Sequence, residues 1–284
     1  MKNTPFLENS FNSKPKNIVY TCVIGNYDKL YPPICDNQDI RYVALTDNPK
    51  LKAPGWELRL IENQSSKNSS LTNRHCKLFP WKYLPEATNS IYVDGNIRII
   101  STPSRLFDLV KDECDIALFR HPDRNFVLEE IEACARHGKV QNQDIINKEY
   151  QALLDDGFID QGRLTENGVI IRSHKSAKLR AAMEMWWSFV HTYSGRDQIS
   201  LHHCLAKTAV KPNILPINFR ERNPFFNLYP HAINIKNPIQ KLDIHLSARR
   251  SEGTLRQIQY ATFRKLCTIP SKTLKFLKNC KFNI

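Results

Sequence analysis

The sequence lacks the short motifs that identify several common enzyme classes. None of its 284 residues forms a G-x-G-x-x-G, G-x-x-x-x-G-K-[ST] or G-x-S-x-G pattern. The first two patterns bind dinucleotides or nucleotide phosphates, and the third carries the nucleophile of α/β-hydrolases. The sequence therefore argues against a Rossmann-type dehydrogenase, a P-loop kinase and an α/β-hydrolase.

Long apolar runs and closely spaced cysteines are also missing. No run approaches the roughly 18 apolar residues of a membrane-spanning helix, and residues 1–16 contain no apolar segment of a secretory signal. The eight cysteines are scattered, and no two are spaced C-x-x-C. This pattern is typical of reduced thiols in a cytosol rather than of a disulfide framework or a zinc ribbon, so we expect a cytoplasmic protein.

Acidic side chains are scarce at the C-terminal end of the chain. The formal net charge is +13, but residues 246–284 hold nine Lys and Arg with one acid, Glu252, whereas the other 245 residues hold 32 basic and 27 acidic side chains. We therefore divide the chain into an N-terminal extension (1–16), a near-neutral domain (17–245) and a basic tail (246–284). We expect an anionic partner for the tail.

Segments with strand and helix signals alternate along the domain. Strands are predicted over residues 17–25, 40–45, 56–61, 90–93, 115–119 and 168–171, and helices over 73–83, 125–155, 177–190 and from about residue 196. Such alternation predicts an α/β fold with a mostly parallel central sheet and helices on both faces. The predicted core includes Trp186, although Trp186 and Trp187 could alternatively form a platform for a sugar.

Polar residues follow four of the predicted strands, at the edge where ligands bind in sheets of this kind. They are residues 25–28, 46–47, 94–96 and 120–121. Asp94 and Asn96 are two residues apart, so in an extended chain their oxygens would project the same way and could bind a divalent cation that holds a diphosphate. Alternatively, Asp94-Gly95 is an ordinary turn.

Two further groups of charged residues have both a structural and a functional interpretation. Arg74 and Lys77 would share one face of a helix, where they could bind a phosphate group or simply form an exposed basic surface. Ser194 and Asp197 fit a capping box, in which Asp197 only begins a helix. Alternatively, Asp197 and Gln198 face the site, where a carboxylate could orient an acceptor hydroxyl or stabilise a positive sugar carbon.

Seven segments, taken together, resemble a known family. They are VYTCVIGNYD (19–28), RHCKLFPWKYLP (74–85), IYVDGNIRI (91–99), ALFRHPDR (117–124), EEIEACARHGK (129–139), LTENGVIIRSH (164–174) and MWWSFVHTYSGRDQISL (185–201). In this order they resemble the bacterial and plant glycosyltransferase-like family long catalogued as a domain of unknown function. Its plant members are linked to pectin and mucilage synthesis through galacturonosyl transfer to rhamnogalacturonan.

The resemblance implies a GT-A-like fold and a set of site residues. Carried over by position, the donor would be bound by Gly25, Asn26, Tyr27, Arg74, Lys77, Asp94, Asn167 and Arg196. The catalytic residues would be Asp197, Gln198 and Glu166, and the acceptor would be bound by Arg120, His121 and Arg124. A divalent cation, Mn²⁺ or Mg²⁺, would be held by Asp94, Asn96 and His231, with His245 as the alternative histidine.

One departure from the family pattern concerns the metal. The usual motif has two carboxylates, D-x-D, whereas this chain has Asn96 at the second position. A neutral amide is a weaker ligand than a carboxylate, which leaves open whether a metal is required.

The resemblance implies a glycosyltransferase that moves a sugar from a nucleotide-sugar, expected to be a UDP-sugar, to a glycan of lipopolysaccharide or capsule type. The order of the motifs is similar to that of glycogenin-type enzymes, which favours retention of configuration. Two other classes stay open, a hydrolase that uses the same pocket and a basic nucleic-acid-binding protein. The near-neutral domain and the absence of a known nucleic-acid module argue against the latter, so we expect no nucleic-acid partner.

The tail is predicted to bind an anionic membrane. Its basic residues alternate with large apolar ones, namely Leu255, Ile258, Phe263, Leu266, Leu274, Phe276 and Leu277. This pattern is typical of helices that lie in the headgroup plane, and Pro270 should divide the helix in two. We expect a peripheral position at the inner face of the cytoplasmic membrane, where a lipid-linked glycan could be the acceptor. The alternative is a tail that packs on the domain or is unstructured.

Overall fold

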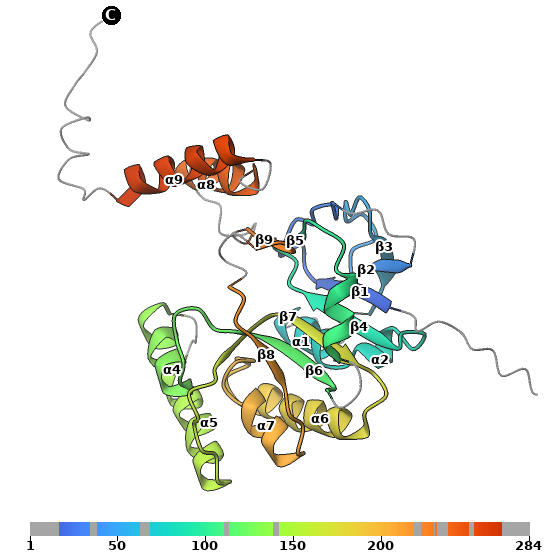
Figure 1. The fold of residues 1–284 in the computed structure, drawn as a ribbon. Helices are drawn as coiled ribbons and strands as arrows, with labels where there is room; N and C mark the ends of the chain where they lie inside the picture. The colour runs from blue at the N-terminus through green and yellow to red at the C-terminus, as the bar shows by residue number, and fades with distance from the viewer. Residues whose placement is uncertain are drawn as a thin grey trace, which may run out of the picture.

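The computed structural model describes residues 17–34, 39–62, 69–110, 114–138, 142–218, 223–229, 231, 238–249 and 253–268. Within these residues a seven-stranded sheet has the order β3-β2-β1-β4-β7-β6-β8, and a two-stranded sheet pairs β5 with β9 (Figure 1). The strands are β1 (Asn17–Val23), β2 (Ile40–Thr46), β3 (Glu57–Leu60), β4 (Asn89–Val93), β5 (Ile97–Ile99), β6 (Ile116–Arg120), β7 (Thr165–Ser173), β8 (Asn213–Leu215) and β9 (Phe226–Leu228).

The large sheet is mostly parallel, as the sequence predicts. Strand β1 pairs in parallel with β2 and β4, β2 with β3, and β6 with β8. Only β7, among the strands of this sheet, runs antiparallel to its neighbours β4 and β6. Because β7 runs in reverse, its first residues lie at the edge where β1 and β4 end, and Asp94 N donates to Gly168 O at 2.8 Å. The reversed direction of β7 therefore brings residues near 166 to the edge of the sheet where Asp94 lies.

The core lies on both faces of the sheet. Alternate residues of β1 belong to different clusters, with Ile18 and Tyr20 on one face and Val19 and Val23 on the other. Strands covered on both sides read as continuous apolar runs, which is why β1 and β4 are visible in the sequence. Trp186 is fully buried in the first cluster, which confirms its predicted place in the core.

Helices flank the sheet. They are α1 (Ser69–Leu78), α2 (Pro80–Tyr83), α3 (Ser104–Phe107), α4 (Val127–Arg136), α5 (Gln143–Asp155), α6 (Ala177–Thr192), α7 (Leu201–Lys207), α8 (Pro238–Arg249) and α9 (Thr254–Thr268), with a 3₁₀ turn, η1 (Asp108–Val110), after α3. With these helices around a mostly parallel sheet, the predicted α/β class is confirmed.

Three predicted helices have different bounds in the structure, each for a local reason. The helix predicted over 73–83 is divided before Pro80, whose nitrogen cannot donate a helical hydrogen bond. The helix predicted over 125–155 ends near Gly138, which has φ +59°, and a second helix begins at Gln143. The helix predicted from about residue 196 begins at Leu201, because the preceding residues form a loop that faces the site.

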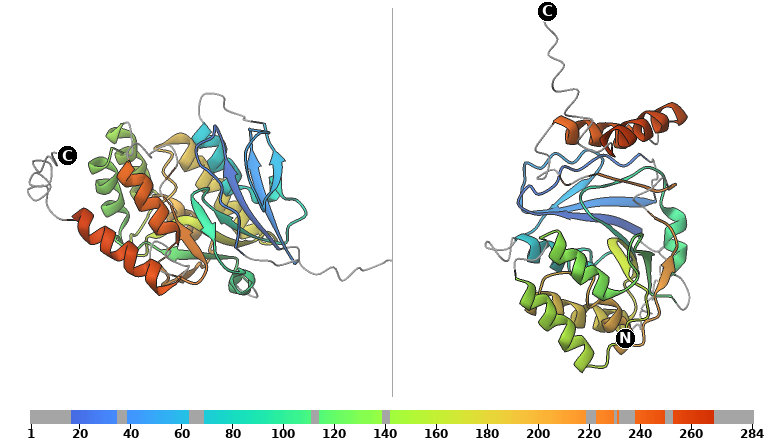
Figure 2. Two further views of the ribbon diagram at one scale, coloured as in Figure 1. Left: turned by 90° about the horizontal axis from the view of Figure 1, so that it is seen from above. Right: turned by 90° about the vertical axis from the view of Figure 1, so that its left-hand side faces the viewer.

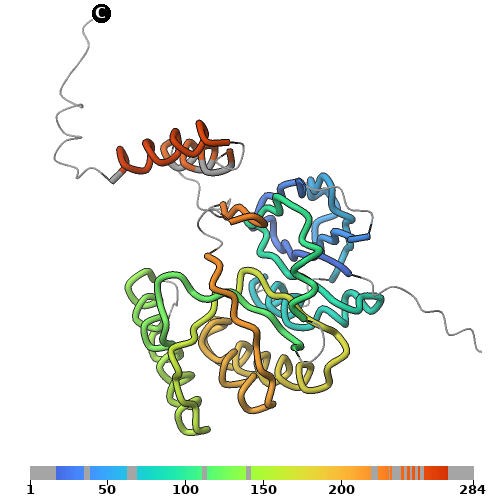
Figure 3. Tube along the Cα trace, viewed as in Figure 1, coloured from blue at the N-terminus to red at the C-terminus, as the bar shows by residue number. Residues whose placement is uncertain are grey.

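Helices α4 and α5 and the pair α8–α9 form separate regions (Figures 1 and 3). The first pair has its own small core, which includes Ile131, Ile146 and Ile199. The second pair lies beside the β5–β9 sheet at one end of the molecule (Figure 2, right). The predicted start of the tail, residue 246, falls inside α8, and Pro270 lies outside the described residues. In the part of the chain that the structure describes, no helix has the length and apolar character needed to cross a membrane.

Candidate active site

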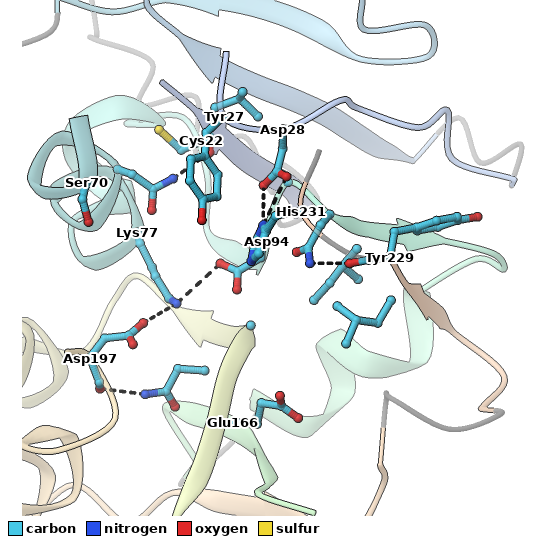
Figure 4. Close-up of a pocket in the computed structure, with 18 of the residues that line it drawn as sticks. Cys22, Tyr27, Asp28, Ser70, Lys77, Asp94, Glu166, Asp197, Tyr229 and His231 are labelled. Atoms are coloured by element: carbon cyan, nitrogen blue, oxygen red, sulfur yellow. Dashed lines mark hydrogen bonds and ion pairs between the residues drawn. The ribbon is translucent and has the colours of Figure 1, made fainter. Parts of the chain in front are cut away.

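A cavity of about 970 Å³ opens where β1 and β4 end and β7 begins (Figure 4). Most of the residues predicted from the sequence line it: Tyr27, Arg74, Lys77, Asp94, Asn96, Arg124, Glu166, Asn167, Arg196, Asp197, Gln198 and His231. Gly25, Asn26, Arg120 and His121 do not line it. The fold therefore brings residues from widely separated parts of the sequence into one polar cavity.

Asp94 enters the cavity from a tight turn. Ile97 N donates to Asp94 O at 2.9 Å, which closes a turn over residues 94–97. A Cβ atom at Gly95 would lie 3.0 Å from side-chain atoms of Asp28 and Val23, so this position has no room for a side chain. The turn interpretation is thus right for the backbone, and the prediction that Asp94 and Asn96 share one side of an extended chain is wrong. The turn nevertheless presents the Asp94 carboxylate to the cavity.

Asn96 is buried and holds the C-terminal part of the cavity wall. Its Nδ2 donates to Tyr229 O at 2.6 Å, and Tyr229 N donates to Asn96 O at 2.9 Å. Its Oδ1 is buried and has no hydrogen-bond partner among the described residues. A carboxylate could not make the first of these bonds, which explains why an asparagine fits here where the family pattern has an aspartate.

His231 is oriented by a carboxylate that the sequence interpretation did not assign. Its Nδ1 lies 3.0 Å and 3.1 Å from the two oxygens of Asp28, which leaves Nε2 for a ligand. Burial favours the neutral imidazole, but the hydrogen bond to Asp28 and the negative charges of Asp28 and Asp94 together outweigh burial and raise the pKa of His231. Asp28 follows the end of β1, and this position at a strand end is the sequence feature that could have identified it as a site residue. His245, the alternative histidine, lies exposed on α8 and does not line the cavity.

These residues offer an incomplete set of metal ligands. Among the described residues, no three His, Cys, Asp or Glu side chains come together as a metal site. Asp94, Asn96 and His231 nevertheless line the same cavity, and Figure 4 shows Asp94 and His231 close together. The buried Oδ1 of Asn96 has no hydrogen-bond partner among the described residues. Such a set fits a divalent cation that takes its other ligands from a diphosphate and water.

Lys77 links the two acidic residues of the cavity. Its side chain is only 2% exposed, and its Nζ lies 2.5 Å from Asp197 Oδ2 and 3.6 Å from Asp94 Oδ1 (Figure 4). Arg74 Nε lies 3.8 Å from the same oxygen of Asp197. Arg74 and Lys77 therefore do not form an exposed basic surface, and that interpretation of the pair is wrong.

Asp197 is ionised in this environment. Burial alone would raise its pKa, but Lys77, Arg74 and Arg196 together hold the pKa well below its usual range. Its carboxylate contacts Lys77 rather than the start of α7, which follows Ser200. The capping-box interpretation of Asp197 is therefore wrong.

The loop that carries Asp197, residues 194–200, is fixed to β7 from one side. Asn167 Nδ2 donates to Asp197 O at 2.8 Å, and Gln198 Nε2 donates to Thr165 O at 3.3 Å. We call residues 194–200 the Asp197 loop. Because β7 also pairs with β4, the loop has a defined position relative to Asp94.

Two buried glutamates that sequence reasoning missed fix the loop from the other side. Glu149 of α5 accepts hydrogen bonds from the backbone N and the hydroxyl of Ser194. Glu130 of α4 lies 3.2 Å from Arg196 Nη2 and 2.7 Å from Arg124 Nε. Burial raises the pKa of Glu149 to about 7, although Ser194, Ser200 and Arg196 act in the opposite direction. Both glutamates occupy otherwise apolar faces of their helices in the sequence. A charged residue at such a position is unusual, and it could have indicated a buried role for each glutamate.

The residues predicted to bind the acceptor lie at different depths. Arg124 lines the cavity, whereas His121 is 2% exposed and its Nδ1 accepts from the backbone N of Asp123 and Arg124. Arg120 points to Asn125, with 2.8 Å between Nη2 and Oδ1. His121 therefore shapes the turn that presents Arg124.

Gly25 and Asn26 form the turn that leads from β1 into the cavity wall. Both have positive φ, +63° and +57°. Gly25 N donates to Asp47 Oδ1 at 3.0 Å, and Asn48 Nδ2 donates to Asn26 Oδ1 at 2.6 Å. These bonds fix the turn to the loop that follows β2. The next residues of the chain, 27 and 28, line the cavity.

The chain is similar to several known proteins. A probable hexosyltransferase from Arabidopsis thaliana, MUCI70, is 25% identical over 173 residues, which are 56% of this chain and 29% of the relative. The aligned region thus spans less than a third of that protein. The apo structure of the bifunctional glycosyltransferase WbbM superposes with a TM-score of 0.43 and 12% identity, over 74% of this chain and 40% of that one. Residues 8–231 match the TOD1/MUCI70 glycosyltransferase-like domain, and the chain belongs to this family.

Proposed function

We propose that the chain is a glycosyltransferase that moves a hexosyl or uronosyl group from a UDP-sugar to a glycan acceptor of a cell-surface polysaccharide. The observation that carries this proposal is Lys77, a buried cation placed between Asp94 and Asp197. The three groups align a site for an anionic leaving group with a site for a developing positive charge. Family membership supports the same reaction class.

The diphosphate side of the reaction falls to Arg74, Lys77 and the Asp94 turn. Cleavage of a sugar–diphosphate bond builds negative charge on the leaving phosphate, which two nearby cations stabilise. Asp94, Asn96 Oδ1 and His231 would hold a divalent cation, Mn²⁺ or Mg²⁺, which would supply further stabilisation of that charge when bound. Tyr92 OH donates to Asp94 Oδ1 at 2.9 Å and fixes the carboxylate for this role.

The sugar side of the reaction falls to the Asp197 loop. A carboxylate that stays ionised and is paired with Lys77 is a poor proton acceptor, so Asp197 would act by its charge on an oxocarbenium-like sugar carbon. Gln198 and Glu166 border the same region of the cavity and would orient the sugar and the acceptor hydroxyl. Retention of configuration is the outcome that we propose, because the order of the motifs is similar to that of glycogenin-type enzymes.

Nucleotide binding is the first test. A thermal-shift panel of nucleotides and nucleotide-sugars, with and without manganese, should select uridine compounds. A donor at about 100 times its dissociation constant should stabilise the protein by about 2.7 kcal/mol. Asp94→Asn should abolish any manganese-dependent part of the shift, while Asp155→Asn, an exposed position on α5, should leave the shift unchanged.

The panel also separates the competing proposals. The donor site would be contradicted if none of the nucleotide-sugars raised the melting temperature. It would also be contradicted if manganese and donor shifted the melting temperatures of the Asp94→Asn and wild-type proteins equally. Transfer requires an acceptor, so release of free sugar from the donor at the same rate without any acceptor would instead indicate a hydrolase.

A further inference from the structure

The α8–α9 helix pair exposes several large apolar side chains. We call residues 238–249 and 254–268 together the C-terminal hairpin. Its exposed apolar side chains are between 46% and 68% accessible: Ile239, Leu242, Leu255, Ile258 and Leu266. In a helix that packs on a soluble domain, large apolar side chains face inward.

The spacing of these residues places them on defined faces. Leu255 and Ile258 are three residues apart and Leu266 follows after eight more, so all three lie on one face of α9. On α8, Ile239 and Leu242 are also exposed, but Ile239 lies one turn from Asp243 and so borders the polar side of that helix. Solitary exposed apolar residues are common on proteins, but a stripe along one helix, with further exposed apolar side chains on its neighbour, indicates a surface that something covers.

The inner side of the hairpin is polar instead. Asp243 and Tyr260 line the active-site cavity, and Gln257 is half-buried on the same side of α9 as Tyr260. Asp243 Oδ1 also lies 3.6 Å from Arg264 Nη1. The hairpin therefore covers part of a polar cavity with polar side chains, and α9 carries its apolar stripe on the face opposite Tyr260.

Positive charge accompanies the apolar stripe. Lys265 is exposed next to Leu266 and lies seven residues after Ile258, on the same face of α9. In the sequence, residues 269–284 add four lysines and no acid. Apolar side chains flanked by cations match an anionic lipid surface, in which the chains enter the headgroup region and the cations bind lipid phosphates.

We propose that the outer face of the C-terminal hairpin docks on an anionic lipid membrane. This assigns the membrane contact chiefly to the apolar stripe of α9 within a packed helix pair, rather than to the charged tail alone. The inference does not depend on the reaction that the cavity catalyses. It also has a geometric consequence, because the cavity lies directly beneath the hairpin and is thus about one helix diameter, roughly 10 Å, from the lipid. A lipid-linked acceptor could reach the site over that distance.

Vesicle binding by the full chain tests the proposal. Co-sedimentation would compare vesicles of phosphatidylcholine alone with vesicles of equal parts phosphatidylcholine and phosphatidylglycerol. We expect the protein to bind only the anionic vesicles, and to bind less at high salt. The triple variant Leu255→Ser, Ile258→Ser and Leu266→Ser should weaken this binding at least about tenfold.

A matched control replaces exposed apolar residues elsewhere. The variant Leu128→Ser, Leu154→Ser and Ile159→Ser changes three exposed side chains on or near α4 and α5 and should bind vesicles like the wild type. Equal losses in both triple variants, or no vesicle binding by the wild type, would overturn the proposal. A wild-type dimer that becomes monomeric in the hairpin variant, without vesicle binding, would show that a second copy covers this face.

Discussion

Charged side chains are usually exposed and large apolar ones usually buried, and the cavity and the C-terminal hairpin each depart from one half of this rule. The cavity holds Lys77 and Asp197 almost fully buried, whereas the hairpin holds Leu255 and Ile258 exposed. In the cavity each buried charge has a partner inside the protein, since Lys77 faces two carboxylates. The exposed apolar stripe has no such compensation within the described part of the hairpin. This difference fits our two proposals, in which the buried charges of the cavity act in the reaction and the exposed apolar side chains of the hairpin contact a membrane.

The largest expected effect comes from Asp197. We predict that Asp197→Asn lowers the rate of sugar transfer by about 1,000-fold, because it removes a fixed negative charge beside the sugar carbon. It should also lower the stability, since Lys77 keeps only the more distant Asp94 as an acidic partner among the described residues. Initial rates and urea unfolding of the same variant measure both effects.

A double variant separates the chemical role of this pair from its structural role. Lys77→Met with Asp197→Leu replaces a buried ion pair by apolar side chains, which in other proteins is neutral or stabilising. We predict that its stability returns toward that of the wild type while transfer stays absent. Recovery of activity along with stability would show that the pair is only structural.

Glu149 gives the next largest effect, and it depends on pH. Its pKa is raised from 4.5 to about 7 in the folded protein, so the stability that the neutral form contributes is full below about 4.5 and is lost as the pH rises through 7. Glu149→Gln stays neutral and should avoid this loss, which amounts to about 3 kcal/mol. Urea unfolding near pH 5 and near pH 8 measures the difference between the two proteins.

The control for this prediction is Glu132→Gln, an exposed glutamate on α4. Its unfolding curve should follow that of the wild type at both pH values. If Glu149→Gln shows the wild-type pH dependence, then Glu149 does not titrate as the buried partner of Ser194.

Asn96 provides a smaller effect on stability. Asn96→Asp would restore the usual two-carboxylate motif, but it would remove the amide that donates to Tyr229 O. We predict a loss of about 1–3 kcal/mol in unfolding free energy, because a carboxylate would face a carbonyl oxygen. Thermal unfolding without metal measures this loss, and an unchanged melting temperature would contradict the explanation given for the asparagine.

The smallest effect should come from the outer face of the hairpin. In solution, the triple serine variant at Leu255, Ile258 and Leu266 should change the unfolding free energy by no more than about 0.5 kcal/mol, since the three side chains are exposed. Transfer to a water-soluble acceptor should also be normal. A large loss of either would mean that these residues pack within the protein, and the contrast with the cavity would fail.

Much of the fold was predictable because its strongest signals are local. The buried strands β1 and β4 read as apolar runs, and the polar residues that follow them, such as Asp94, lie at the expected edge of the sheet. The antiparallel direction of β7 was not predictable, because an apolar strand has the same local pattern in either direction. The short strands β5, β8 and β9 contain only three residues each, too few for a periodic pattern.

The candidate site was predictable as a set of residues but not as a network. The family resemblance names Lys77, Asp94 and Asp197, yet their contacts join positions up to 120 residues apart. Whether Lys77 is exposed or buried depends on the helix that carries it and on the loop opposite, and no local pattern contains that information. Glu130 and Glu149 were missed for the same reason, since a glutamate on an apolar helix face has no assigned partner until the Asp197 loop is in place.

The measurement that tests the central claim most directly is donor turnover by the purified chain. UDP release would be followed with a panel of UDP-sugars, manganese and glycan acceptors, for the wild type, Asp197→Asn and the exposed control Asp155→Asn. We predict acceptor-dependent UDP release by the wild type and by Asp155→Asn, and almost none by Asp197→Asn although it still binds UDP. Equal release by all three proteins would contradict the assignment of this cavity as the site of glycosyl transfer.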